Sequence, residues 1–168
     1  MKFLILLIFF SINTFANEKN NIAVVDMDKI INQTIDFQEF NLKINQYIVQ
    51  KNKEIELLKN KKNNNKKVLS LNILSPQGVI NKDKESSIID KKIHLIVLES
   101  QNYIKEEEIK VKNKIIRKIM PLIEEYSKVN NLILIVDIST IVYESKIKFI
   151  DISNAISVIY NNKYSKNK

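Results

Sequence analysis

The chain of 168 residues contains no cysteine or tryptophan, one glycine, one histidine and two prolines. Without cysteine there is no thiol nucleophile, and no disulfide can stabilise the fold in an oxidising compartment. Because Gly78 is the single glycine, neither a Gly-x-Gly-x-x-Gly turn nor a phosphate-binding loop can be written. The sequence therefore predicts a protein that is not an enzyme and does not use ATP. The scarcity of glycine and proline also favours long uninterrupted helices.

Few residues are candidates for catalysis or metal binding. His94 lies in an apolar stretch at helical spacing, which is typical of a packed or half-exposed helix residue. The run Glu106–Glu108 spreads around a helix and is most simply a solvated face. Asp137, at the end of an apolar run, suits a turn or a cap. We therefore predict no catalytic residue, no metal site and no cofactor.

The first 16 residues have the pattern of a signal peptide. Lys2 supplies a minimal positive region, residues 3–10 are an unbroken apolar run, and Thr14-Phe15-Ala16 resembles a cleavage site. A transmembrane helix needs about 20 apolar residues, and polar residues interrupt this stretch well before that length. We expect cleavage after Ala16, export, and a mature chain that begins near Asn17; that the destination is the periplasm is implied by the resemblance described below.

The stretch 36–129 dominates the mature chain and indicates two long helices. Apolar residues recur at mostly three- and four-residue steps in both halves, as in helices that share a seam, although Lys51, Ser100 and Glu108 interrupt the repeat. Ser75 suits an N-cap, and Pro76 suits the first turn of the returning helix. We therefore expect an antiparallel coiled-coil hairpin with its tip near 63–81, and an outgoing helix that reaches residue 74.

Short β-branched runs flank this hairpin and predict a small head, formed from residues 17–35 and 130–160. The first strand is expected at 22–27, followed by a helical turn at 28–34. The run 132–136 is apolar on both faces and suits a central strand buried on both sides. The remaining expectations are further short strands at 141–143 and 146–150, a helix at 152–160 capped by Asp151, and a frayed tail at 161–168.

About 50 to 60 residues remain for the compact head, too few for a comfortable core. With neither disulfides nor a metal cluster available, oligomerisation is the obvious remedy. Residues that we expect in the oligomer core are Val24, Val25, Leu132, Leu134 and Val136. The predicted fold class is therefore α+β, a small β-rich trimerisation head with a long antiparallel helical hairpin, in which the number of subunits comes from the resemblance described below.

The net charge of +8 is unevenly distributed. Lys2 carries +1, residues 17–50 carry −2, residues 51–92 carry +6 and residues 93–168 carry +3, so the excess lies on the distal hairpin. Most such runs are solvated faces, but a basic surface also attracts anionic or acidic partners. Candidate electrostatic contacts are Lys59, Lys61, Lys62, Lys66, Lys67, Lys82, Lys84, Lys91 and Lys92. Candidate apolar contacts, which could equally close the tip, are Val68, Leu69, Leu71, Ile73 and Leu74.

Five segments carry a family resemblance: the run 22–30 after a signal peptide, the Lys/Glu-rich helical hairpin, and the segments 132–137, 142–143 and 149–156. In this order they resemble the Skp (OmpH-like) family of periplasmic chaperones. The arms are similar only in character, since Asn and Ile replace much of the Ala and Gln usual in that family. The resemblance implies a homotrimer whose hairpins surround a cavity that holds unfolded outer-membrane proteins without ATP.

Two functions remain open on the residues alone. The first is an export-pathway holdase, which needs exposed apolar surface close to charge. The second is an exported structural coiled-coil protein whose basic arms bind an anionic surface such as a membrane. The basic stretch lacks interleaved aromatic residues, and export also argues against a nucleic-acid partner.

Overall fold

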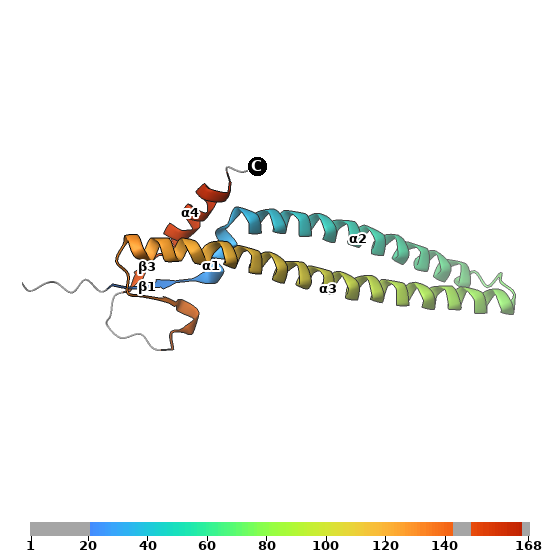
Figure 1. Cartoon of the computed structure of the whole chain (residues 1–168). Helices are drawn as coiled ribbons and strands as arrows, with labels where there is room; N and C mark the ends of the chain where they lie inside the picture. The colour runs from blue at the N-terminus through green and yellow to red at the C-terminus, as the bar shows by residue number, and fades with distance from the viewer. Residues whose placement is uncertain (1–20, 143–148, 166–168) are drawn as a thin grey trace, which may run out of the picture.

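The computed structural model describes residues 21–142 and 149–165 (Figure 1). The expected signal peptide and its cleavage after Ala16 lie outside these residues. The elements in chain order are β1 (Ile22–Val25), α1 (Met27–Gln33), α2 (Ile35–Ser70), α3 (Pro76–Val129), β2 (Leu134–Asp137), the 3-10 turn η1 (Ile138–Thr140), β3 (Ile150–Asp151) and α4 (Ser153–Tyr164).

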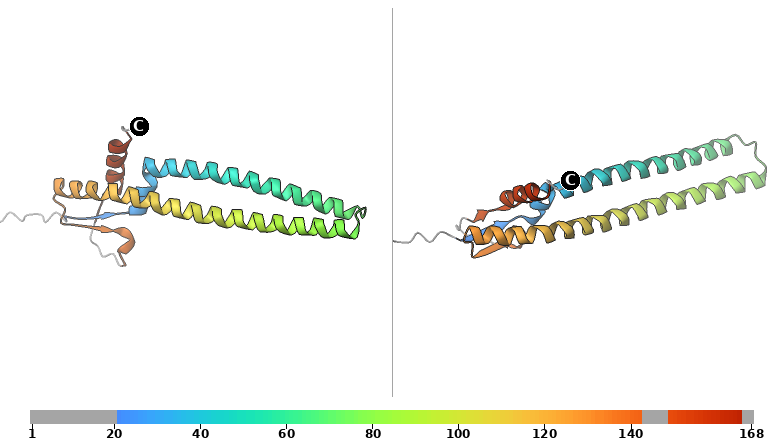
Figure 2. Two further views of the ribbon diagram at one scale, coloured as in Figure 1. Left: turned by 45° about the vertical axis from the view of Figure 1, so that its right-hand side comes forward. Right: turned by 45° about the horizontal axis from the view of Figure 1, so that its top comes forward.

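Two long helices form a hairpin that projects from a small head, as all three views show (Figure 2). The helix α2 has 36 residues and α3 has 54 residues. At 1.5 Å per residue these helices are about 54 Å and about 80 Å long. The helix α3 therefore runs the whole length of the arm and continues through the head, where α4 and the sheet pack on it. The predicted fold class, a helical hairpin with a small β region, is confirmed.

At the tip, α3 starts where it was predicted to start, and α2 ends earlier than predicted. Ser75 is the N-cap of α3, because its Oγ accepts a hydrogen bond from the amide of Gly78 at 3.2 Å, and Pro76 occupies the first turn. The helix α2 ends at Ser70 rather than at residue 74. Asn72 has a φ of 52°, a left-handed conformation that asparagine tolerates and that ends the helix.

The head sheet has three parallel strands in the order β2-β1-β3. Ile22 pairs with Leu134 and Ala23 pairs with Ile150. The prediction that 132–136 forms a central strand buried on both sides is wrong, because β1 is central and β2 is an edge. Within the described residues, β1 is the one strand before the hairpin, and the two later strands pair with its two sides.

The core of the head lies where α3, α4 and β1 meet. Its fully buried members include Ala23, Ile30, Ile115, Ile119, Leu122, Ile152, Ile156 and Tyr160.

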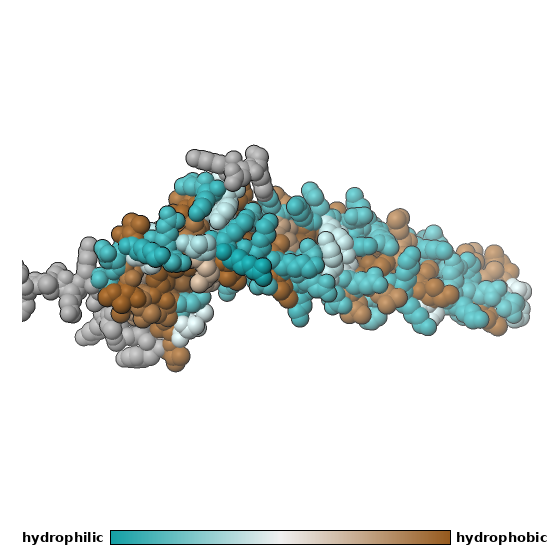
Figure 3. Space-filling model, viewed as in Figure 1, coloured by the Kyte–Doolittle hydropathy of each residue, from teal (hydrophilic) through white to brown (hydrophobic). Residues whose placement is uncertain are grey.

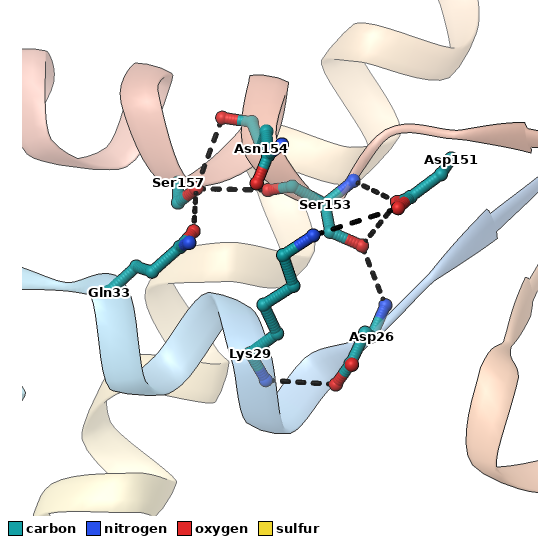
Figure 4. Close-up of polar contacts among 7 residues, drawn as sticks. All are labelled: Asp26, Lys29, Gln33, Asp151, Ser153, Asn154 and Ser157. Atoms are coloured by element: carbon teal, nitrogen blue, oxygen red, sulfur yellow. Dashed lines mark hydrogen bonds and ion pairs between the residues drawn. The ribbon is translucent and has the colours of Figure 1, made fainter.

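A polar network joins α4 to β1 and α1 (Figure 4). The hydroxyl of Ser153 accepts from the amide of Asp26 at 2.8 Å and donates to the carboxylate of Asp151 at 2.6 Å. Ser157 Oγ lies 2.7 Å from Gln33 Oε1.

The C-terminal elements differ in detail from the expectations. The strand β3 is confined to Ile150–Asp151, while Ile141 and Val142 follow η1 outside any strand, and residues 143–148 lie outside the described residues. The helix α4 starts at Ser153, with Ile152 and not Asp151 at the N-cap position. It continues to Tyr164, so the expected fraying from Asn161 is wrong. The reason is tertiary, since the Asn161 side chain accepts from the Ile35 amide and donates to the Gln33 carbonyl.

Candidate functional site

The surface of the helical arm is the candidate functional site, and its seam determines which side chains face outward. Near the head, Phe37 and Phe40 of α2 are buried in the same cluster as Ile115 and Ile119 of α3. Halfway along, the rings of Tyr47 and Tyr103 lie 4.7 Å apart. The hydroxyl of Tyr47 also lies 3.4 Å from Ser100 Oγ. Ser100, which interrupts the apolar repeat, therefore has a hydrogen-bond partner in the seam.

Farther out, charged side chains contact one another across the seam. The carboxylate of Glu85 on α3 lies 2.9 Å from Lys61 Nζ on α2 and 2.9 Å from Lys82 Nζ on its own helix. Lys82 also donates to Asn65 Oδ1 across the seam at 3.1 Å. The hydrogen bonds from Lys61 and Lys82 lower the pKa of Glu85 to about 2. Lys62 pairs with Asp90 at 2.6 Å.

The nine candidate lysines therefore fall into two groups. Lys61 and Lys62 pair with carboxylates across the hairpin, whereas Lys82 pairs with Glu85 on its own helix and donates to Asn65 on α2. The other six are exposed and form no salt bridge within the part of the chain that the structure describes; they are Lys59, Lys66, Lys67, Lys84, Lys91 and Lys92. Only this second group presents positive charge that a partner could use without disturbing the arm.

The five apolar residues proposed at the tip are also divided. Leu71 and Ile73 lie exposed in the turn. Val68, Leu69 and Leu74 are half-buried. Leu74 packs beside Gly78, since a Cβ added to Gly78 would lie 3.6 Å from Leu74 Cδ2. The tip thus uses part of its apolar surface to close the turn and leaves Leu71 and Ile73 to solvent.

A larger exposed apolar surface runs along α3, and the sequence reasoning missed it. We call this surface the α3 stripe; it consists of Ile80, Ile88, Leu95, Leu98 and Ile109, all exposed. At 3.6 residues per turn these positions lie within about 80° of one another, on the side of α3 away from its seam. Ile88 and Leu95 each directly precede a buried seam residue, which is the signal that could have revealed a second apolar face. Along the arm, hydrophobic side chains emerge among hydrophilic ones (Figure 3).

The head exposes apolar side chains along its β2 edge. Val24 and Val25, expected in an oligomer core, are buried inside the single chain. Leu132 and Val136 are half-buried, Leu134 is 50% exposed, and the adjacent Ile133 is 82% exposed. The structure thus places only the β2 part of the expected oligomer core where another chain could reach it.

A charged cluster joins the arm to the head. The carboxylate of Asp36, in the first turn of α2, accepts from Lys118 Nζ at 2.6 Å and from Tyr160 Oη at 2.9 Å. Burial raises the pKa of Asp36, but these two hydrogen bonds and the positive charges of Lys118 and Lys114 together outweigh it, so the net shift is downward. Burial and the bond to Asp36 raise the pKa of Tyr160. Three helices are therefore linked at the base of the arm.

The described residues contain no group of three or more His, Cys, Asp or Glu side chains placed to hold a metal ion. His94 is exposed on α3, and Asp137 caps η1 by accepting from the Ser139 amide at 2.9 Å. Among the helices of the described residues, none combines the length and the apolar character that crossing a membrane requires.

No protein-family model and no curated protein matches this chain. A crystal structure from Caulobacter crescentus does match; its description proposes an outer membrane chaperone (OmpH-like). The match covers 85% of each chain with a TM-score of 0.64 and 11% sequence identity. The order of elements, the projecting hairpin and this match agree, and the chain has the fold of that OmpH-like protein.

Proposed function

We propose that this protein is an ATP-independent holdase of the periplasm that binds unfolded outer-membrane proteins and prevents their aggregation. The observation that carries the proposal is the α3 stripe, an exposed apolar surface on a projecting arm. Beside it lie Lys84, Lys91 and Lys92, which form no salt bridge with the described residues. Exposed apolar surface of this kind is a mark of a binding surface. The stripe spans about 44 Å along the helix axis.

An unfolded client suits a surface of this kind. The stripe is long and interrupted by polar side chains, so it offers many weak apolar contacts and no shaped pocket. Such contacts are non-directional and depend on the apolar area removed from water, which allows clients of different sequence to bind. Release then needs a competing process that buries the same client surface, such as folding into a membrane, and not nucleotide.

We propose further that three chains associate through their heads, with the arms around a shared cavity. Support comes from the β2 edge, where Leu134 and the preceding Ile133 are exposed, and where one side of the strand has no partner strand among the described residues. An exposed apolar strand edge invites pairing with another chain. The expected signal peptide and the description of the structurally similar protein both support a periplasmic location.

Light scattering from an aggregating, urea-diluted β-barrel protein tests the central claim. The mature protein should suppress the scattering without nucleotide, and replacing 42–109, which removes the whole α3 stripe, with a short Gly/Ser linker should abolish protection while the heads stay assembled. An active linker variant would mean that the arm is not the binding element. Binding of the mature protein to anionic vesicles, with no effect on scattering, would favour the structural alternative.

The apolar and basic surfaces can be separated with matched variants on one helix. Changing Ile88, Leu95 and Leu98 to Gln should raise the rate of client dissociation, because apolar contact is lost. Changing Lys84, Lys91 and Lys92 to Gln should slow capture at low salt, because exposed charges act over about 8–10 Å and mainly affect association. Stopped-flow binding of a labelled client across a salt series distinguishes the two, and equal effects on both rates would contradict the division.

A similar lysine variant can be made on α2, and the contacts of each lysine decide which residues it should include. Lys61 and Lys62 pair with Glu85 and Asp90 across the seam, so substituting them would also change contacts within the arm. Lys59, Lys66 and Lys67 are exposed and are the appropriate residues to change to Gln. Unchanged capture at low salt would identify this lysine run as a solvated face.

A further inference from the structure

The seam between α2 and α3 changes from apolar to polar toward the tip. Close to the head it buries Phe37, Phe40 and Ile115. In the distal part, the buried α2 residue is Asn65, which is only 4% exposed. Asn65 thus occupies a seam position where an apolar side chain would normally pack against the partner helix.

Asn65 belongs to what we call the distal polar layer, formed by Lys61, Asn65, Lys82, Glu85 and Ser86. Glu85 bridges Lys61 and Lys82, and Lys82 returns across the seam to Asn65 Oδ1. The next apolar seam residue toward the head is Ile89, which is buried. The layer therefore separates the tip from the apolar seam.

Two atoms in this layer are buried without a partner. Asn65 Nδ2 and Ser86 Oγ make no hydrogen bond within the described residues. Leaving a buried donor or acceptor unsatisfied carries a desolvation cost, whereas exposed ion pairs contribute little. The side chains of Lys61 and Asp90 are more than half exposed, so their pairs do not offset this cost. The layer is the weakest part of the seam.

We propose that the distal polar layer is a built-in opening point of the arm. The part of α3 between Ile89 and the tip separates from the facing end of α2 and rejoins it. The seam between Ile89 and the head stays closed. Opening lets water reach Asn65 Nδ2 and Ser86 Oγ, which removes their desolvation cost. It also exposes the half-buried Val68, Leu69 and Leu74. The arm therefore has two states that differ in the reach and apolar surface of its tip.

Salt shifts this equilibrium toward the open state. The pairs Lys61–Glu85 and Lys62–Asp90 cross the gap between the helices and are broken on opening. Because both pairs are partly exposed, salt screens their attraction. Near the head, the α2–α3 ion pair between Asp36 and Lys118 has side chains only 14% and 25% exposed, so salt screens it less.

Native-state hydrogen exchange of the whole mature protein, without client, tests the proposal. Amides at 58–70 and 76–88 should exchange at least tenfold faster than those at 103–119, since local opening is easier than opening of the core. Raising the salt from 50 mM to 500 mM should speed the exchange of the distal amides alone. The expected factor is about threefold, which matches the small contribution of an exposed ion pair. Equal rates in both regions would mean that the arm opens as one unit and would overturn the proposal.

The chain contains its own control, because Asn64 is exposed and Asn65 is buried. Both substitutions to Leu raise helix propensity similarly, but only Asn65→Leu replaces the polar seam position. Asn65→Leu should slow distal exchange about tenfold more than Asn64→Leu. This factor corresponds to the desolvation cost of one buried polar group without a hydrogen bond. Equal slowing by the two variants would overturn the proposal.

Ser86 and Ser87 offer a second matched pair. Ser86→Ala removes a buried unpaired hydroxyl, while Ser87→Ala changes an exposed one. We expect Ser86→Ala to slow distal exchange about threefold more, since a hydroxyl is a smaller polar group than an amide. A slowing no greater than that of Ser87→Ala would remove Ser86 from the opening point.

Discussion

The head and the arm are stabilised in different ways. In the head, Ile30, Ile119 and Ile156 are fully buried and belong to one cluster. In the arm beyond Tyr47, the buried residues are Asn65, Ile89 and Ile96, and most apolar side chains remain partly exposed. Packing on several sides makes the head cooperative, whereas two helices alone can bury only one face each. The difference means that the same substitution has different consequences in the two regions.

The largest effect should come from a charge in the sheet. Val24 is buried in β1, and an unpaired carboxylate there costs several kcal/mol, so Val24→Asp should unfold the head. Leu134→Asp lies at the half-exposed β2 edge and should leave the chain folded while weakening association. Circular dichroism and sedimentation measure the two outcomes. A stable folded monomer for the unaltered protein would contradict the proposed assembly.

A smaller difference should separate two isoleucines on the same helix. Ile119→Ala removes a fully buried side chain and should lower the free energy of unfolding by about 2–5 kcal/mol. Ile109→Ala changes an exposed residue of the α3 stripe and should stay within about 0.5 kcal/mol. Urea unfolding at one fixed protein concentration measures both. Similar losses for the two variants would mean that Ile109 is covered in the assembly.

At the junction between the regions, Tyr160→Phe removes the hydrogen bond to Asp36. Because the acceptor is charged, the expected loss is about 1.5 kcal/mol in the free energy of unfolding. Tyr164→Phe is the control, since its ring lies 4.5 Å from Lys118 Nζ and keeps that contact without the hydroxyl. An equal loss in both variants would show that the rings, and not the Asp36 bond, fasten the arm.

The smallest effect should appear in acid at the distal arm. The pKa of Glu85 is lowered from 4.5 to about 2, so its contribution is complete above pH 4.5 and is lost as the pH falls through 2. Distal exchange, corrected for the intrinsic rate, should therefore increase between pH 4.5 and pH 2 more than exchange near Ile115. Glu85→Gln should remove most of this excess. If the excess persists in that variant, other carboxylates control the acid response.

The hairpin could be predicted from sequence because its signals are local. The three- and four-residue repeat, the cap at Ser75 and the proline at Pro76 each act within a few residues. The α3 stripe was missed because it follows the same repeat as the seam, displaced by one position at Ile88 and Leu95. Deciding which of two apolar faces is the seam requires the partner helix.

The head was less predictable because its contacts join distant parts of the chain. The run 132–136 is apolar enough for a buried strand, but its place at an edge depends on β1 having a second neighbour in β3. Asn161 was expected to fray, yet it bridges the backbone on both sides of Thr34. No local pattern reports a hydrogen bond to a segment so far away in sequence.

The parallel pairing of β1 with β2 also constrains how the chain folds. Ile22 must find Leu134, and the whole hairpin lies between them. Closing so long a loop from an unfolded chain is entropically costly, and such pairing is slow. Zipping α2 against α3 first shortens that search, because it brings the two chain segments to the same end of a rod. We therefore expect the proximal seam around Phe40 and Ile115 to form the folding nucleus, with the sheet completed last.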